Sequence, residues 1–170
     1  MTQNKASIPR PFVQKITPLR PERKIVLVDM DGTLADCSHR EHHIQTKPPN
    51  WPAFFRGMGQ DPPNASIVEL TRRLAADHDI LIVTGRPQEF LGETLDWLAR
   101  NGIAPAEIWM RRAGDHRPDF VVKREVLDHV PRERIVFVLD DRERVCDMWD
   151  SEGLVCHRVK QGECELTRKS

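Results

Sequence analysis

The sequence has no net charge and no long apolar segment. Lysine and arginine together number 26, as do aspartate and glutamate. The overall charge therefore gives no support for a polyanionic partner, although it does not exclude a local basic patch. No apolar run approaches the roughly 20 residues that cross a bilayer, and the N-terminus lacks the apolar core of a secretory signal. We therefore expect a protein without membrane segments, located in the cytoplasm.

Cysteine is scarce, and its spacing is unlike that of a zinc site. The four cysteines stand at positions 37, 146, 156 and 164, and no two of them form a C-x-x-C pair. A zinc site would have to use Cys146 and Cys156, which lie in segments with helix-like and strand-like patterns. Reduced, mostly buried thiols are the expected state.

The sequence does contain a regular alternation of short apolar runs and amphipathic segments. Its 170 residues, 39% apolar and 31% charged, suit one soluble, globular domain. The apolar runs predict five strands, at residues 24–29, 79–85, 107–110, 134–141 and 154–159. Helices are predicted over 66–78 with Asn64 as the cap, from Pro87 to Asn101, from Pro118 to 130, and over 142–153. This order predicts an α/β fold, with an open, mostly parallel Rossmann-like sheet and helices on both faces.

Two segments fall outside this alternation. Residues 1–23 are rich in proline and basic residues without a period, so we expect an N-terminal arm extended along the surface. Residues 36–63 are rich in histidine, proline, glycine and aromatic residues, again without a period. The predicted domain therefore covers residues 24–170, with a small cap inserted after the first strand at about 36–63.

Polar side chains collect where the predicted strands end. Ligands of such sheets bind beyond the carboxyl ends of the strands. The side chains expected there are Asp29 and Asp31, then Thr84, Gly85 and Arg86, and finally Asp140 and Asp141. Four carboxylates in one crevice repel one another unless a cation lies among them. An all-oxygen site of this kind suits Mg²⁺, so the sequence predicts a magnesium site.

The spacing D-x-D-G-T assigns separate roles to the first two carboxylates. Asp29, beside the cation, would stay ionised and attack phosphorus to form an aspartyl phosphate. Asp31 would face the leaving group, donate a proton and later take one from water. Gly32 permits the turn that brings backbone N–H groups to the phosphate, and Thr84 and Lys123 would hold phosphoryl oxygens. The alternative, that acids at strand ends only solvate loops, does not account for the whole ordered set.

The ordered motifs resemble those of the haloacid dehalogenase (HAD) superfamily of phosphohydrolases. VDMDGTLAD, IVTGR, Lys123 and LDDR are similar to its four motifs, and the resemblance covers residues 24–162. It implies that Asp29 is the nucleophile, that Asp31 is the acid/base, and that Thr84 and Lys123 bind phosphate. It also implies a metal held by Asp29, the backbone carbonyl of Asp31, Asp140 and Asp141.

A closer resemblance is to the phosphatase domain of phage-type polynucleotide kinase-phosphatases, which removes phosphate from the 3′ ends of nucleic acid. It rests on MRRAGDHRPDFVVKREVL and on VFVLDDRERVCDMWDSEGLVCHRVKQGE. The resemblance implies substrate contacts by Arg40, Arg86 and Asp119. The full-length enzymes also carry a kinase domain with a P-loop. This chain contains no G-x-x-x-x-G-K-[ST] motif, so we expect no kinase activity.

Several of these residues keep two interpretations. Arg40 is either a substrate ligand or a surface arginine, and Asp119 either orients Lys123 or is a first-turn acid favoured by the helix dipole. The aromatic residues of the insert either stack on a base or pack the cap onto the body. The arginines after the third strand either track a nucleic-acid backbone or form an ordinary basic loop. The aromatic residues are Trp51, Phe54 and Phe55, and the arginines are Arg111, Arg112 and Arg117.

The sequence therefore predicts a Mg²⁺-dependent phosphomonoesterase that removes terminal 3′-phosphates, with a phosphorylated nucleic-acid end or a nucleotide as its partner. One alternative is a small-molecule phosphatase, such as a 5′-nucleotidase, that uses the same residues. Another is a binding module that keeps the fold without catalysis. A closed, narrow cap would favour the small molecule, and an open groove would favour polymer ends. The sequence leaves homo-oligomerisation open.

Overall fold

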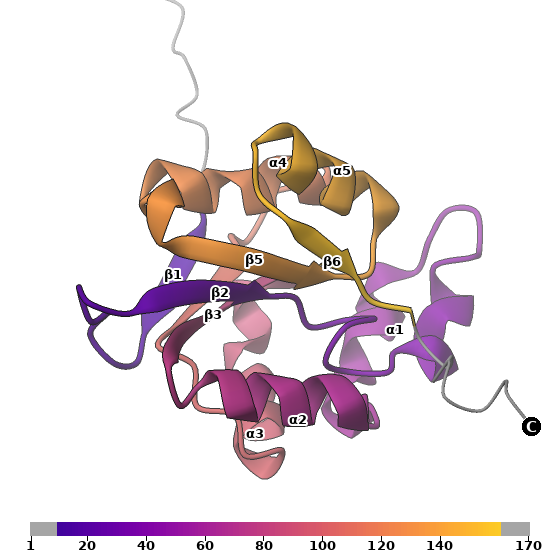
Figure 1. Ribbon diagram of the computed structural model, residues 1–170. Helices are drawn as coiled ribbons and strands as arrows, with labels where there is room; N and C mark the ends of the chain where they lie inside the picture. The colour runs from indigo at the N-terminus through magenta and orange to yellow at the C-terminus, as the bar shows by residue number, and fades with distance from the viewer. Residues whose placement is uncertain (1–9, 161–170) are drawn as a thin grey trace, which may run out of the picture.

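Six strands form one sheet at the centre of the computed structural model, which describes residues 10–160 (Figure 1). Across the sheet their order is β1-β4-β3-β2-β5-β6. Their bounds are β1 Phe12–Lys15, β2 Lys24–Val28, β3 His78–Pro87, β4 Glu107–Arg111, β5 Ile135–Asp140 and β6 Cys156–Arg158. Strands β2 to β6 pair in parallel, so the predicted mostly parallel α/β sheet is confirmed.

The sheet has one strand more than the five that the sequence predicts. Strand β1 lies within the predicted arm 1–23 and pairs antiparallel with β4, where Phe12 lies opposite Met110. The strand is only four residues long and has no period-2 pattern of its own, so its conformation depends on the free edge of β4. Residues 1–9 of the predicted arm lie outside the described part of the chain.

Helices cover both faces of the sheet, as predicted (Figure 1). They are α2 Ala65–Leu74 and α3 Leu91–Arg100 on one face, and α4 Asp119–Arg124 and α5 Glu143–Ser151 on the other. Alternate residues of β2 pack into two separate cores. Ile25 and Leu27 share a core with Trp149 of α5, whereas Val26 and Val28 share one with Trp97 of α3. The continuous apolar run of β2 is thus explained by burial on both faces.

Three predicted helix boundaries are wrong. The helix expected over 66–78 ends at Leu74, and His78 already belongs to β3. The helix expected to begin at Pro87 begins at Leu91, because β3 continues through Pro87 and a 3₁₀ turn, Gln88–Phe90, follows. Proline fixes φ near a value that extended backbone also allows, and here ψ is 144°, so the residue continues the strand. The helix expected to run from Pro118 to 130 ends at Arg124 and gives way to a 3₁₀ turn at Glu125–Asp128.

The insert 36–63 follows β2 and lies beyond the carboxyl ends of the central strands (Figure 1). It contains the 3₁₀ turn Ser38–His43, the helix α1 Trp51–Arg56 and the 3₁₀ turn Met58–Gln60. The Asn50 side chain caps α1 by accepting from the Ala53 N–H at 3.1 Å. Phe54 and Met58 are buried, so this insert has a small apolar interior of its own.

Two further features of the described residues bear on the predictions. Cys37, Cys146 and Cys156 are buried free thiols, and Cys164 lies outside residues 10–160. Within this range, no helix has the length and apolar character needed to cross a membrane.

Candidate active site

The parallel register of the central strands brings their last residues to one edge of the sheet. Val28 at the end of β2 is aligned with Ile82 of β3 and with Leu139 of β5. Asp29 follows directly, and its N–H donates to the Leu139 carbonyl at 2.9 Å. The motifs that follow β2, β3 and β5 therefore meet at this edge, as the sequence predicts.

Three carboxylates gather there around one lysine. Asp29, Asp140 and Asp141 each offer an oxygen, and these oxygens lie within 4.8 Å of one another. The Nζ of Lys123 on α4 donates to Asp29 Oδ1 at 2.8 Å and to Asp140 Oδ2 at 2.7 Å. The second oxygen of Asp29 accepts from the Thr33 hydroxyl at 3.1 Å. The structure thus brings together four of the predicted site residues, Asp29, Lys123, Asp140 and Asp141.

The cluster carries more negative charge than its lysine balances. Burial raises the pKa of Asp29 well above its usual range, and Asp140 and Asp141 add to this effect while Lys123 opposes it. Burial and the charge of Asp140 raise the pKa of Asp141 to about 6. Burial works against the charge of Lys123, but the carboxylates of Asp140 and Asp29 still raise its pKa. A cation among the three carboxylates would relieve this repulsion.

One buried oxygen in the cluster has no partner in the described part of the chain. Oδ1 of Asp141 is buried and accepts no hydrogen bond there. An orphaned carboxylate oxygen is costly in a protein interior unless it binds a cation or water. The donor set of three carboxylates is of the all-oxygen kind that Mg²⁺ prefers. The residues present therefore fit a divalent cation.

Two glycines allow the close packing of this site. Gly32 has φ of +87°, and a Cβ placed on it would lie 2.0 Å from Oδ2 of Asp141. A Cβ on Gly85 would lie 2.1 Å from Oδ1 of Asp119. Both distances are far below van der Waals contact, so any side chain here would displace a carboxylate. Gly32 is therefore explained by space and by its positive φ, whereas Gly85 is explained by space.

Asp31 lies beside this cluster and is held by two arginines. Nη2 of Arg86 lies 2.6 Å from its Oδ1, and Nη2 of Arg40 lies 2.5 Å from the same oxygen. Burial of Asp31 alone would raise its pKa, but the charges and hydrogen bonds of Arg86 and Arg40 lower it to about 2. Asp31 is therefore an ionised carboxylate in this arrangement.

Arg40 is not a surface residue, which excludes one of its two interpretations. Only 2% of its surface is exposed, and its guanidinium carbon lies 4.1 Å from the centre of the Phe54 ring. Arg86 is fully buried, and the Arg86 N–H donates to the Thr84 hydroxyl at 3.2 Å. Arg40 comes from the insert and Arg86 from the end of β3, so both segments contribute to the surroundings of Asp31.

Asp61 is a further member of the site that the sequence did not indicate. Its carboxylate accepts from Arg40 at 2.8 and 2.6 Å, from Arg86 at 3.3 Å, and lies 2.8 Å from His39 Nε2. It lies at the end of the insert, in the segment G-Q-D-P-P, which has no periodicity and matches no motif used above. Only the folded insert brings it to the arginines.

Asp119 and Arg111 form a second ion-pair group, which is partly buried. Asp119, the first residue of α4, accepts from Arg111 Nη2 at 2.8 Å and from Arg142 Nη1 at 2.9 Å. The hydrogen bonds of Lys123 go to Asp29 and Asp140, so Asp119 does not orient Lys123 by direct contact. Burial of Asp119 opposes its charge, but Lys123, Arg142 and Arg111 lower its pKa.

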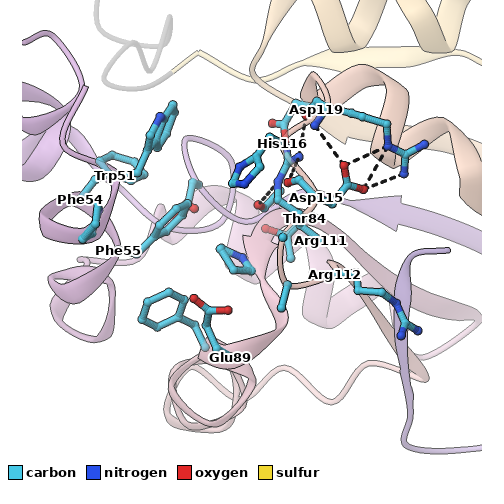
Figure 2. A pocket seen from close by; sticks show the side chains of 18 of the residues that line it. Trp51, Phe54, Phe55, Thr84, Glu89, Arg111, Arg112, Asp115, His116 and Asp119 are labelled. Atoms are coloured by element: carbon cyan, nitrogen blue, oxygen red, sulfur yellow. Dashed lines mark hydrogen bonds and ion pairs between the residues drawn. The ribbon is translucent and has the colours of Figure 1, made fainter. Parts of the chain in front are cut away.

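A pocket of about 720 Å³ opens above the carboxylates. It is lined at its base by Asp29, Asp31, Thr84 and Gly85. Figure 2 shows its two walls, with Trp51 and Phe55 of α1 on one side. On the other side are Arg111 at the end of β4 and Arg112 and His116 of the following loop. Phe54 is buried and packs the insert, whereas Trp51 is 43% exposed. The packing interpretation thus holds for Phe54, and base stacking stays a prediction for Trp51 and Phe55.

Comparison with known proteins agrees with the fold and the motifs. The family model of the polynucleotide kinase PNKP phosphatase domain matches residues 23–164. Chains in two solved structures of Pnkp1/Rnl/Hen1 complexes are similar to this chain, with 22% and 23% identity and TM-scores of 0.68 and 0.69. The alignments cover 96% and 95% of this chain but 52% and 49% of those chains, so this chain spans about half their length.

A more distant neighbour has the same fold. The haloacid dehalogenase-like hydrolase SP0104 from Streptococcus pneumoniae has 13% identity and a TM-score of 0.55, and the alignment covers 79% of this chain and 83% of that one. Because the family model spans most of the sequence and its motif residues meet at one pocket, the chain belongs to the PNKP phosphatase-domain family of the HAD superfamily and is a phosphatase.

Proposed function

We propose that this phosphatase removes 3′-phosphates from the ends of nucleic acid, with Mg²⁺ as its cofactor and Asp29 as its nucleophile. One observation carries the proposal: Asp29, which pairs with Lys123, lines a pocket that has one aromatic and one basic wall. The similar chains belong to complexes that one of the structures describes as RNA repair complexes, which supports a nucleic-acid end as the substrate.

In the proposed mechanism, Asp29 attacks the phosphorus atom and forms an aspartyl phosphate. Lys123, at 2.8 Å from the nucleophile, neutralises charge as the phosphoryl group is transferred, and Thr84 at the base of the pocket holds a phosphoryl oxygen. Asp29, Asp140 and Asp141 would hold Mg²⁺ together with the backbone carbonyl of Asp31, and the ion would balance their charge and that of the substrate.

Asp31 is proposed to transfer the proton to the leaving 3′-oxygen. A pKa of about 2 disfavours this role while Arg40 and Arg86 pair with the carboxylates of Asp31 and Asp61. A bound phosphate would bring additional negative charge to the same arginines, and nearby negative charge raises the pKa of a carboxyl group. The substrate itself would thus prepare Asp31 for protonation, and Asp31 would later take a proton from the water that hydrolyses the intermediate.

A substrate panel tests the proposal. It offers 3′-phosphorylated and 5′-phosphorylated oligonucleotides of RNA and DNA, nucleoside monophosphates and sugar phosphates, each with Mg²⁺ or with chelator. We expect phosphate release from 3′ ends that requires Mg²⁺ and is abolished in Asp29→Asn. Turnover of sugar phosphates without any turnover of oligonucleotide ends would refute the proposed substrate. The nucleoside monophosphates test the 5′-nucleotidase alternative, because a pocket of this size also accommodates one nucleotide.

A further inference from the structure

Aromatic rings form a continuous strip along one wall of the pocket. Trp51 and Phe55 of α1 stack at 5.9 Å between ring centres, with 22° between the planes. Phe55 continues to Phe90, before α3, at 5.5 Å and 32°. All three side chains line the pocket that holds Asp29 at its base. The strip therefore joins the insert to the body of the domain and reaches the reaction centre.

Trp51 is much more exposed than the other three tryptophans. Trp97, Trp109 and Trp149 are at most 6% exposed, whereas Trp51 is 43% exposed. Phe54, on the same short helix, already packs the insert and meets the Trp51 ring edge-on at 5.8 Å. Packing of the insert thus accounts for Phe54 but leaves one face of the Trp51–Phe55 pair to the pocket (Figure 2).

The charges around the strip suit a polyanion. Arg111 and Arg117 are fixed by ion pairs with Asp119 and with Asp115. Arg56 on α1 and Arg112 on the opposite loop also line the pocket, and neither forms an ion pair within residues 10–160. Arg112 donates from Nε to the Arg10 carbonyl at 2.8 Å, which holds its side chain without cancelling its charge, and Glu89 is the acidic residue of the pocket next to Phe90. Two guanidiniums without an ion pair near an exposed aromatic strip form the combination that binds single-stranded nucleic acid, with stacking for bases and cations for the backbone.

We propose that Trp51 and Phe55 stack on the base of the nucleoside that carries the phosphate, while Arg56 and Arg112 contact the adjoining phosphodiester. This inference rests on the proposed function and makes it more specific: the enzyme recognises the terminal base as well as the phosphate. Stacking is tolerant of base identity because every base has a π-face, so no strong sequence preference is expected.

The test compares two substrates that differ only at the terminal base. One oligonucleotide ends in an ordinary nucleoside 3′-phosphate and the other in an abasic tetrahydrofuran 3′-phosphate. In Trp51→Leu, which keeps an apolar side chain, we expect kcat/KM on the base-bearing end to fall at least about fivefold, mainly through KM, since stacking contributes about 1–3 kcal/mol per base. The rate on the abasic end should not change. Trp51→Phe should restore most of the loss.

Val155→Ala is the matched control, because Val155 is 58% exposed but does not line the pocket. It should leave both rates unchanged. An equal loss on the two substrates in Trp51→Leu would overturn the proposal, as would no loss on the base-bearing end.

Fluorescence provides a measurement that does not depend on turnover. In the Asp29→Asn variant, a base-bearing 3′-phosphorylated trinucleotide should quench emission from Trp51, the exposed tryptophan, and the abasic analogue should not. Quenching should be lost in Asp29→Asn with Trp51→Leu. If the wild type hydrolyses neither oligonucleotide, the proposed function fails, and the presence or absence of quenching still decides whether the strip binds bases.

Discussion

The Arg86 guanidinium lies against the carboxylate of Asp31, with Nη2 2.6 Å from Oδ1 and Nε 3.1 Å from both oxygens. Arg40 reaches the same carboxylate from the insert. A segment at the end of β3 and a segment of the insert therefore hold one acidic residue between them. The insert is thus part of the reaction centre, in addition to forming one wall of the pocket.

Asp31→Asn should change how stability depends on pH. The folded-state pKa of Asp31 is lowered to about 2, from an ordinary value near 3.8. A lowered carboxyl pKa contributes stability above the ordinary value, and this contribution is lost as the pH falls from about 4 to about 2. For a shift of this size the contribution is about 2 kcal/mol at pH 7. Urea unfolding in chelator should show the variant less stable at pH 7, with a gap that narrows towards pH 2. A gap that stays constant would contradict the assigned ion pairs.

Asp61→Asn should disturb the site although Asp61 does not line the pocket. The substitution leaves Arg40 and Arg86 buried with only the Asp31 carboxylate as a counter-charge, and removing one partner of a buried ion pair costs about 3–5 kcal/mol. We expect that loss in the free energy of unfolding and a fall of about tenfold or more in kcat/KM. Asp96→Asn, at an exposed position, is the control. Normal stability with normal activity would show that the arginines do not depend on Asp61.

Gly85→Ala should lower activity by displacing Asp119. The added Cβ would lie 2.1 Å from Asp119 Oδ1, so the carboxylate must turn away from Arg111 and Arg142. Gly92→Ala is a matched control, since nothing lies within 4 Å of a Cβ there and Gly92 lies in α3. The control should gain about 0.5–1 kcal/mol from helix propensity and keep its activity. Equal kcat/KM in the two variants would refute a role for the Asp119 position.

Magnesium binding should strengthen as the pH rises through about 6. The pKa of Asp141 is raised to about 6 by burial and by Asp140, so a cation must displace a proton at lower pH. Because the pKa of Asp141 is higher in the folded state than in the unfolded state, the metal-free protein should become less stable as the pH rises from about 4 to about 6. Mg²⁺ should offset this loss. Thermal unfolding with and without Mg²⁺ at pH 5.5 and 7.5 should show the larger increase in Tm at pH 7.5.

The controls for this prediction are two carboxamide substitutions. Asp141→Asn should remove most of the Mg²⁺ effect at both pH values. Asp147→Asn changes an exposed carboxylate that pairs with Arg158, and it should leave the effect intact. A Tm that does not respond to Mg²⁺ in the wild type would argue against a divalent cation at Asp29, Asp140 and Asp141.

The sequence by itself determined the alternating fold and the reaction centre. Its apolar runs end in acids, and parallel strands bring their ends to one edge, so the meeting of Asp29, Asp140 and Asp141 follows from linear order. The sequence could not indicate β1, because four residues acquire their strand conformation only from the edge of β4. It also could not locate the start of α3, since Pro87 suits either a first turn or a strand end.

Only the tertiary structure decided what surrounds Asp31 and what lines the pocket. Arg40 and Asp61 come from a segment without periodicity, and their burial depends on how the insert folds against β3 and α3. The same folding buries Phe54 and leaves Trp51 43% exposed. Local patterns specify elements and their ends, whereas an aperiodic insert takes its arrangement from contacts distant in the sequence, which linear spacing does not encode.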